Sequence, residues 1–123
     1  MTVISSSSAP EFHTGGTHVI GLASPSRGAN DTSVWRVTLD AGTASPAHEL
    51  EREEVFVALS GAATANIDGV EHQVSPGDAL IVPRDTPFSI ACRGDSPFEA
   101  ICCLPVGAKA VVDGSAFVPP WAE

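Results

Sequence analysis

The chain has 123 residues, with 15 acidic and 6 basic side chains and a formal net charge of -9 at pH 7. This acidic balance opposes binding to nucleic-acid phosphates and to anionic membrane surfaces, and no stretch approaches the ~20 consecutive apolar residues that span a bilayer. The length fits one domain around a single core. We therefore expect a small-molecule ligand as the partner, with no nucleic acid and no membrane.

Residues 1–16 contain four consecutive serines, a proline and a Gly-Gly pair without periodicity, which predicts a flexible N-terminal arm. The first ten residues lack the basic and apolar segments of a secretory signal. The three cysteines are odd in number and have no CxxC spacing, so neither a disulfide framework nor a zinc ribbon is indicated. We expect a cytoplasmic protein with reduced thiols, and its Arg-, Ala- and Gly-rich composition is typical of a GC-rich bacterial genome.

Short apolar or alternating stretches, separated by turn residues, follow from residue 18 to residue 104. Trp35, Val37 and Leu39 alternate with polar residues and form the expected inner face of one strand. Asp68-Gly69 is a dipeptide favoured in tight hairpins. No stretch has a helical period, so the pattern predicts an all-β sandwich or barrel. The expected strands are 18–23, 34–39, 55–60, 63–67, 70–74, 79–82, 88–92 and 98–104.

The last segment holds Phe117-Val118-Pro119-Pro120-Trp121, whose prolines lack the donor that a central strand needs. We expect a C-terminal tail whose Phe117 and Trp121 cover the apolar barrel wall. A lid or a dimer contact is the alternative, because aromatic side chains are enriched in both settings. The chain then divides into an arm (1–16), a barrel (17–104) and a tail (105–123).

The stretch from Gly42 to Gly61 has a characteristic spacing. Gly42 is followed by five residues, His48, one residue, Leu50, three residues, Glu54, six residues and Gly61. This spacing resembles the first signature motif of the cupin family: Gly, five residues, His-x-His, three or four residues, Glu, six residues and Gly. Every spacing agrees, and one residue differs, because Leu50 stands where the family has its second histidine.

A second motif begins at Gly77, with five residues to Pro83. It has Asp85 where the family usually has Gly, Phe88 where it has a metal-binding histidine, and Cys92 where Asn is common. Together the two motifs span residues 42 to 92. The resemblance implies the cupin fold, a double-stranded β-helix or jelly-roll barrel, and a homodimer.

In metal-binding cupins, both histidines and the glutamate of the first motif and the histidine of the second coordinate one divalent ion. The matching positions here are His48, Leu50, Glu54 and Phe88. Leu and Phe have no lone pairs, and one imidazole plus one carboxylate falls short of the three protein ligands of catalytic zinc sites. We therefore expect a pocket with no metal and no cofactor.

A straight strand would hold His48 and Glu54 ~20 Å apart, so a shared site requires a turn between Leu50 and Glu53. With that turn, an imidazole and a carboxylate face one cavity that Leu50 and Phe88 make more apolar. Desolvation then raises the pKa of Glu54 and lowers that of His48, toward values useful in acid and base catalysis. A direct contact between the two groups would shift both pKa values the other way.

Three functions are compatible with these residues. The first is a metal-independent isomerase, cyclase or lyase, with His48 as general base and Glu54 as acid or orienting group. The second is a non-catalytic module that binds or senses a small ligand, in which both groups are relics. The third, supported by fold analogy alone, is a metal-dependent dioxygenase with an atypical ligand set. The expected pocket residues are Trp35, Leu50, Phe56 and Phe88.

The remaining candidate ligands are scattered. No spacing requires that His13 or His72 join a metal site, and His72 is expected at the surface of a hairpin strand. His18 is left as a residue that can reach the pocket from the first strand. Cys102 and Cys103 are adjacent, so at most one of them can face the inside of a barrel. Three acidic residues near the first motif are expected on a solvated face: Glu49, Glu51 and Glu53.

Overall fold

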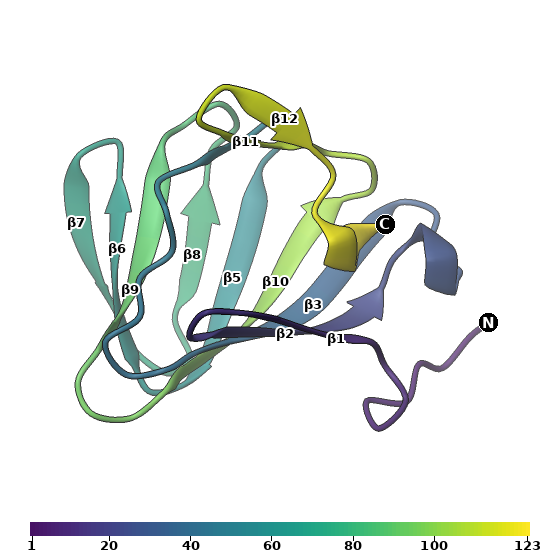
Figure 1. Cartoon of the computed structure of the whole chain (residues 1–123), viewed down its shortest axis with the longest axis horizontal. Coiled ribbons are helices and arrows are strands. Elements are labelled where there is room, and N and C mark those ends of the chain that lie inside the picture. Colours follow the sequence, from purple (N-terminus) through teal and green to yellow (C-terminus); the bar gives the residue numbers. More distant parts are fainter.

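Figure 1 shows the computed structural model of residues 1–123, an all-β barrel with two single-turn 3-10 helices. This architecture confirms the fold class predicted from the sequence. No helix is long and apolar enough to cross a membrane. The elements are β1 (Glu11–Thr14), β2 (Thr17–Ala23), η1 (Pro25–Arg27), β3 (Thr32–Leu39), β4 (Glu49–Leu50), β5 (Glu54–Ser60), β6 (Ala62–Ile67), β7 (Val70–Val74), β8 (Ala79–Val82), β9 (Phe88–Arg93), β10 (Phe98–Pro105), β11 (Ala110–Val112), β12 (Ser115–Phe117) and η2 (Pro120–Ala122).

Three antiparallel sheets make up the barrel. The largest has six strands in the order β1-β2-β3-β10-β5-β8, and a three-stranded sheet has the order β7-β6-β9. A small sheet of β12, β11 and β4 lies across one end of the barrel, at the top of Figure 1. Isolated bridges from Ala44 to Ala91 and from His48 to Phe88 attach the segment between β3 and β4 to β9. The first cupin-like motif is therefore held against the second.

Strict alternation on the central strands sets the inner face. Along β10 every second residue is buried, from Phe98 to Leu104. Trp35 and Leu39 on β3 are buried as the sequence predicted, with 5% and 3% of their surfaces exposed. Twenty buried apolar residues form one core cluster, so the barrel interior is a single hydrophobic unit rather than two.

The prediction of a flexible arm over residues 1–16 is wrong for Glu11–Thr14, which form strand β1. This strand pairs with β2 over four residues, from Glu11 opposite Ile20 to Thr14 opposite Thr17. The Gly-Gly pair between Thr14 and Thr17 is the two-residue loop of this hairpin, and its first glycine has a φ of 56°. A polar four-residue strand has no apolar alternation, so the sequence pattern could not reveal it.

The tail folds back over the open end of the barrel, as Figure 1 shows. Hydroxyl groups of Ser24 and Ser26 each donate to the main-chain oxygen of Glu123 at 2.6 Å. The Arg27 guanidinium donates to the Trp121 carbonyl at 3.0 Å. These bonds hold η2 against β2 and β3, and they fix the position of the Trp121 side chain.

Candidate functional site

The barrel encloses a cavity of about 260 Å³ that is predominantly apolar. It is lined by 21 residues, of which 14 are hydrophobic, and no lysine or arginine is among them. All six site residues predicted from the sequence line this one cavity. Aromatic rings surround it on several sides, contributed by Trp35, Phe56, Phe88, Phe98, Phe117 and Trp121.

Glu54 is the buried carboxylic acid of the cavity. It begins β5, opposite Val82 of β8, and only 3% of its surface is exposed. Desolvation raises its pKa from 4.5 to about 8, and no hydrogen bond to the carboxylate offsets that effect. The group therefore keeps its proton at neutral pH and is an uncharged acid.

His48 also lines the cavity, is half-buried and is held through Phe88. The two residues exchange main-chain hydrogen bonds of 3.0 and 2.9 Å, and their rings lie 4.2 Å apart. His48 Nδ1 lies 2.8 Å from the Pro46 carbonyl oxygen. A carbonyl oxygen can only accept, so Nδ1 carries the proton and Nε2 keeps the lone pair. Burial lowers the pKa of His48, and the bond to Pro46 opposes this shift in part.

A bend between β4 and β5 brings His48 and Glu54 to the same cavity, as the shared site required. The chain leaves β4 at Leu50 and enters β5 at Glu54. Glu51 fixes the bend: its N–H donates to the Lys109 carbonyl at 3.0 Å, and its carboxylate accepts from the Lys109 N–H at 3.3 Å. The pKa shifts of both groups arise from burial, in the directions expected from an apolar cavity.

The residues at the four cupin ligand positions do not fit a metal ion. Leu50 and Phe88 belong to the core, with 3% and 2% of their surfaces exposed. No three histidine, cysteine, aspartate or glutamate side chains anywhere in the chain are grouped so that they could hold an ion. His48 and Glu54 are thus left without a third protein ligand.

Cys102 is a cavity residue that the motifs did not identify. It lies on β10 between Trp35 of β3 and Phe56 of β5, and 1% of its surface is exposed. Burial, and then the charges that Glu54 and Cys103 carry once they are ionised, raise the pKa of the Cys102 thiol well above its ordinary value, against the lowering effect of a hydrogen bond with Trp35. The Cys102 thiol therefore stays protonated and unreactive at neutral pH. The sequence signal for its inward position was the alternation of strand β10, in which only one of the adjacent Cys102 and Cys103 can face the cavity.

The tail supplies the other unpredicted part of the site. Trp121 packs edge-on at 6.0 Å from Phe12 and at 6.2 Å from Trp35, measured between ring centroids. Phe117 also lines the cavity, although 42% of its surface is exposed. Both aromatic residues therefore line the cavity, and Trp121 also packs against the core of the barrel.

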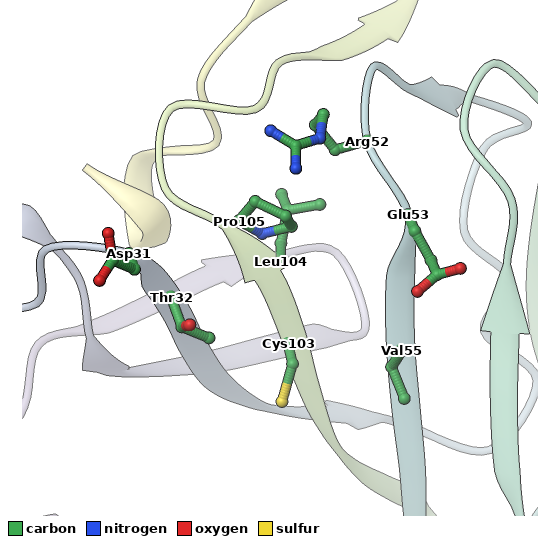
Figure 2. Close-up of a pocket in the computed structure, with 8 residues that line it drawn as sticks. All are labelled: Asp31, Thr32, Arg52, Glu53, Val55, Cys103, Leu104 and Pro105. Atoms are coloured by element: carbon green, nitrogen blue, oxygen red, sulfur yellow. The ribbon is translucent and has the colours of Figure 1, made fainter.

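A second hollow of about 250 Å³ lies on the outer side of the large sheet and is shown in Figure 2. Cys103 and Val55, which face each other across β10 and β5, point into it. Its rim carries the exposed charged side chains of Asp31, Arg52 and Glu53. These groups are solvated at an open surface, so we assign the functional site to the enclosed cavity.

The other histidines lie outside the cavity. His72 is exposed on β7, as expected. His18 does not line the cavity, because the inward positions of β2 at its start are Thr17 and Val19. The strand pattern thus directs His18 to the outer side of the sheet.

Comparison with known proteins agrees with this architecture. The family model described as "Cupin domain" matches residues 35–104. An uncharacterized protein of Methanocaldococcus jannaschii, MJ1618, is 31% identical over 51 residues, which cover 42% of this chain and 41% of that protein. The chain therefore matches less than half the length of this curated relative.

Two solved structures show the same fold over most of the chain. The polyketide cyclase RemF from Streptomyces resistomycificus superposes with a TM-score of 0.77 at 16% sequence identity, and the match covers 98% of this chain and 88% of the RemF chain. KdgF from Halomonas sp. superposes with a TM-score of 0.74 at 19% sequence identity, and the match covers 85% of this chain and 94% of the KdgF chain. At these identities the likeness concerns the fold alone.

Proposed function

This chain belongs to the cupin family, and we propose that it binds a small, electrically neutral, largely apolar molecule in the barrel cavity and acts on it by acid and base catalysis without a metal ion. The observation that carries the proposal is the pair formed by Glu54 and His48. At neutral pH one is a protonated acid and the other an unprotonated base, and both line one apolar cavity. An isomerase, cyclase or lyase uses such a pair, because one group gives a proton while the other takes one.

The neutral charge of the ligand follows from the cavity wall. Of the lining residues only His48, Glu54 and Cys102 can ionise in the neutral range or near it, and all three are uncharged at pH 7. A ligand carboxylate or phosphate would lose its hydration and find no cation to pair with, which costs several kcal/mol. The volume of about 260 Å³ lies just below the ~300–1,000 Å³ of drug-sized pockets. A compact, uncharged molecule with an aromatic or aliphatic ring fits both the uncharged cavity wall and this volume.

The roles of the two groups follow from their protons. The lone pair of His48 Nε2 removes a proton from an activated C–H or O–H of the ligand. The Glu54 carboxyl donates to a carbonyl or leaving oxygen, where negative charge develops. Ring closure, double-bond migration and elimination all need this pair of transfers, and the RemF relative is named as a cyclase. Metal independence is supported by Leu50 and Phe88 at two ligand positions.

A matched pair of probes tests the charge selectivity. We expect 2-naphthol, which is neutral at pH 7, to bind at least tenfold more tightly than 2-naphthoate, which has the same rings and one negative charge. Binding is followed by protein NMR, with the Phe56→Leu variant as a check that the perturbed signals belong to the cavity. Equal binding of both probes, or preference for the carboxylate, would contradict a neutral ligand.

Turnover by acid and base catalysis is tested by comparing the wild type with the His48→Gln and Glu54→Gln variants on neutral cyclic ligands that bind in the cavity. We expect each variant to lose ~10²–10⁴-fold in kcat, as for other general acids and bases. In the wild type, kcat/KM rises through the lowered pKa of His48, below 6.5, and falls above the Glu54 pKa of about 8. Unchanged binding with no turnover in any of the three proteins would favour the alternative, a non-catalytic sensor.

Assembly as a cytoplasmic homodimer is part of the same proposal. Three apolar side chains on the outer face of β5 and on β8 support a dimer, because much of their surface remains exposed: Val57 (38%), Leu59 (42%) and Ile81 (59%). All three cysteines are free thiols, which suits a reducing compartment. Light scattering during gel filtration measures the mass, and a monomer at micromolar concentration would contradict the dimer.

A further inference from the structure

Two histidines meet on the outer side of the barrel, away from the cavity. His13 of β1 and His18 of β2 are directly opposite each other across the hairpin. Their Nδ1 atoms are 2.6 Å apart, and the rings meet edge to face with centroids 4.7 Å apart. The neighbouring pair, Thr14 and Thr17, lines the cavity, so alternation directs both histidines outward.

Each histidine also has a carboxylate at its second nitrogen. His18 Nε2 lies 3.1 Å from Asp40 Oδ2, and His13 Nε2 lies 4.0 Å from Glu11 Oε2. A carboxylate accepts, so the proton of neutral His18 is on Nε2 and its Nδ1 holds a lone pair directed at His13. His13 Nδ1 therefore donates its proton to the His18 Nδ1 lone pair at 2.6 Å, so both Nδ1 atoms face the same space between the two strands.

We propose that His13 and His18 chelate one divalent transition-metal ion, Cu²⁺, Ni²⁺ or Zn²⁺, through their Nδ1 atoms, with Asp40 and Glu11 as orienting carboxylates. Imidazole nitrogens suit these ions, and Cu²⁺ binds most tightly in the general order of affinities. When the ion displaces the His13 proton from Nδ1, the neutral ring carries its hydrogen on Nε2 and presents it to Glu11. His18 then has the carboxylate–histidine–metal arrangement that fixes the ring and raises its basicity, and rotation of His13 brings its Nε2, now 4.0 Å away, toward Glu11.

Chelation needs both rings to rotate, because their Nδ1 atoms face each other along the hydrogen bond and must instead converge on one ion. Metal–nitrogen bonds of ~2.0–2.1 Å at right angles require the two nitrogens to be roughly 3 Å apart, a few tenths of an ångström more than the 2.6 Å between them. The side chains are 58% and 38% exposed, so they can rotate and water can complete the coordination sphere. The net charge of -9 also draws cations to the surface.

The ion would join β1 to β2 next to Thr14 and Thr17, which line the cavity. Beyond the histidine pair, β1 carries Phe12, which packs on Trp121, and Thr14, which lines the cavity. Binding to the folded hairpin alone therefore stabilises the folded protein by mass action. This site is independent of the proposed catalysis, because neither histidine lines the cavity.

The test is titration of the metal-free full chain with Cu²⁺, Ni²⁺ and Zn²⁺ by calorimetry, with electron paramagnetic resonance of the Cu²⁺ form. We expect one ion per chain and nitrogen coupling from two imidazoles. His13→Gln and His18→Gln each weaken binding at least tenfold. Asp40→Asn, which keeps both ligands, weakens it ~10-fold, since loss of a carboxylate that is hydrogen-bonded to a metal-binding histidine costs roughly 10–100-fold. His72→Gln, at another exposed strand histidine, leaves the affinity unchanged.

Circular dichroism shows whether each variant is folded, and Asp40→Asn keeps the test informative if a histidine variant is not. Unchanged stoichiometry and affinity in the His13→Gln/His18→Gln double variant would overturn the proposal. Loss of binding in His48→Gln alone would also overturn it, and would place the ion in the cavity against the metal-free catalysis proposed above. Loss in the hairpin variants with full binding in His48→Gln supports the chelating pair.

Discussion

We expect Glu54→Gln to raise the free energy of unfolding at pH 7 by about 3 kcal/mol. Burial raises the pKa of the Glu54 carboxyl from 4.5 to about 8, with no hydrogen bond to offset the burial. At pH 7 the unfolded chain has released this proton and the folded chain has kept it. The gap between pH 7 and the unfolded pKa of 4.5, at 1.36 kcal/mol per unit, gives a cost to folding of about 3 kcal/mol. Glutamine has a similar shape and no charge to desolvate, so the cost disappears.

The sign of the pH dependence is specific to this group. Between pH 4.5 and 8 the folded state binds more protons than the unfolded state, so wild-type stability falls as the pH rises through this window. Below pH 4.5 the carboxyl is protonated in both states and has no such cost. The advantage of Glu54→Gln over wild type therefore grows by about 1.4 kcal/mol per pH unit from pH 5 and levels off above 8.

Urea unfolding at pH 5, 6, 7 and 8, followed by tryptophan fluorescence, measures these differences. A gain of about 3 kcal/mol corresponds to a rise in Tm of roughly 10 °C for a chain of this length. Glu53→Gln is the matched control, because the preceding residue is exposed and its substitution removes a charge of the same sign. If wild type and Glu54→Gln have parallel stability curves across the pH range, the carboxyl is not desolvated and the acid role assigned to it fails.

Three further substitutions test the fold, the tail and the dimer. Gly61→Ala is expected to lower the free energy of unfolding, measured in urea, by more than ~3 kcal/mol, because Gly61 has a φ of 74° and an added Cβ would clash with the Pro97 carbonyl oxygen. The control Gly69→Ala also has a positive φ, 81°, but its Cβ would enter open space, so it is expected to cost only ~1–2 kcal/mol. Trp121→Phe is expected to change the free energy of unfolding by less than ~1 kcal/mol. It removes an indole N–H that is buried without a hydrogen-bond partner, and this gain offsets the loss of buried ring area. Trp121→Ala removes the whole ring and is expected to cost ~2–3 kcal/mol in the same assay. Ile81→Glu, at a side chain 59% exposed on β8, is expected to shift the light-scattering mass from dimer to monomer, and an unchanged dimer mass would exclude this face as the interface.

The sequence was informative where the structure depends on local pattern. Alternation around Trp35 predicted the inner face of β3, and motif spacing predicted that His48 and Glu54 share a site. Packing of Trp121 on the barrel was expected, but its place in the cavity lining could not be predicted, because hydrogen bonds to residues more than ninety positions earlier, such as Ser24, hold the tail. Contacts of this kind leave no periodic signal in a sequence.

The loss of metal ligands and the acidity of the site have one physical cause. A carboxylate beside a metal ion would be held ionised by the positive charge. With Leu50 and Phe88 at two ligand positions, Glu54 instead faces an apolar wall, and desolvation alone raises its pKa to about 8. The Phe88 ring also lies 4.2 Å from the His48 ring, and burial lowers the pKa of that imidazole. Leu50 and Phe88, which stand where metal-binding cupins have histidines, thus help to bury both the acid and the base of the proposed catalysis.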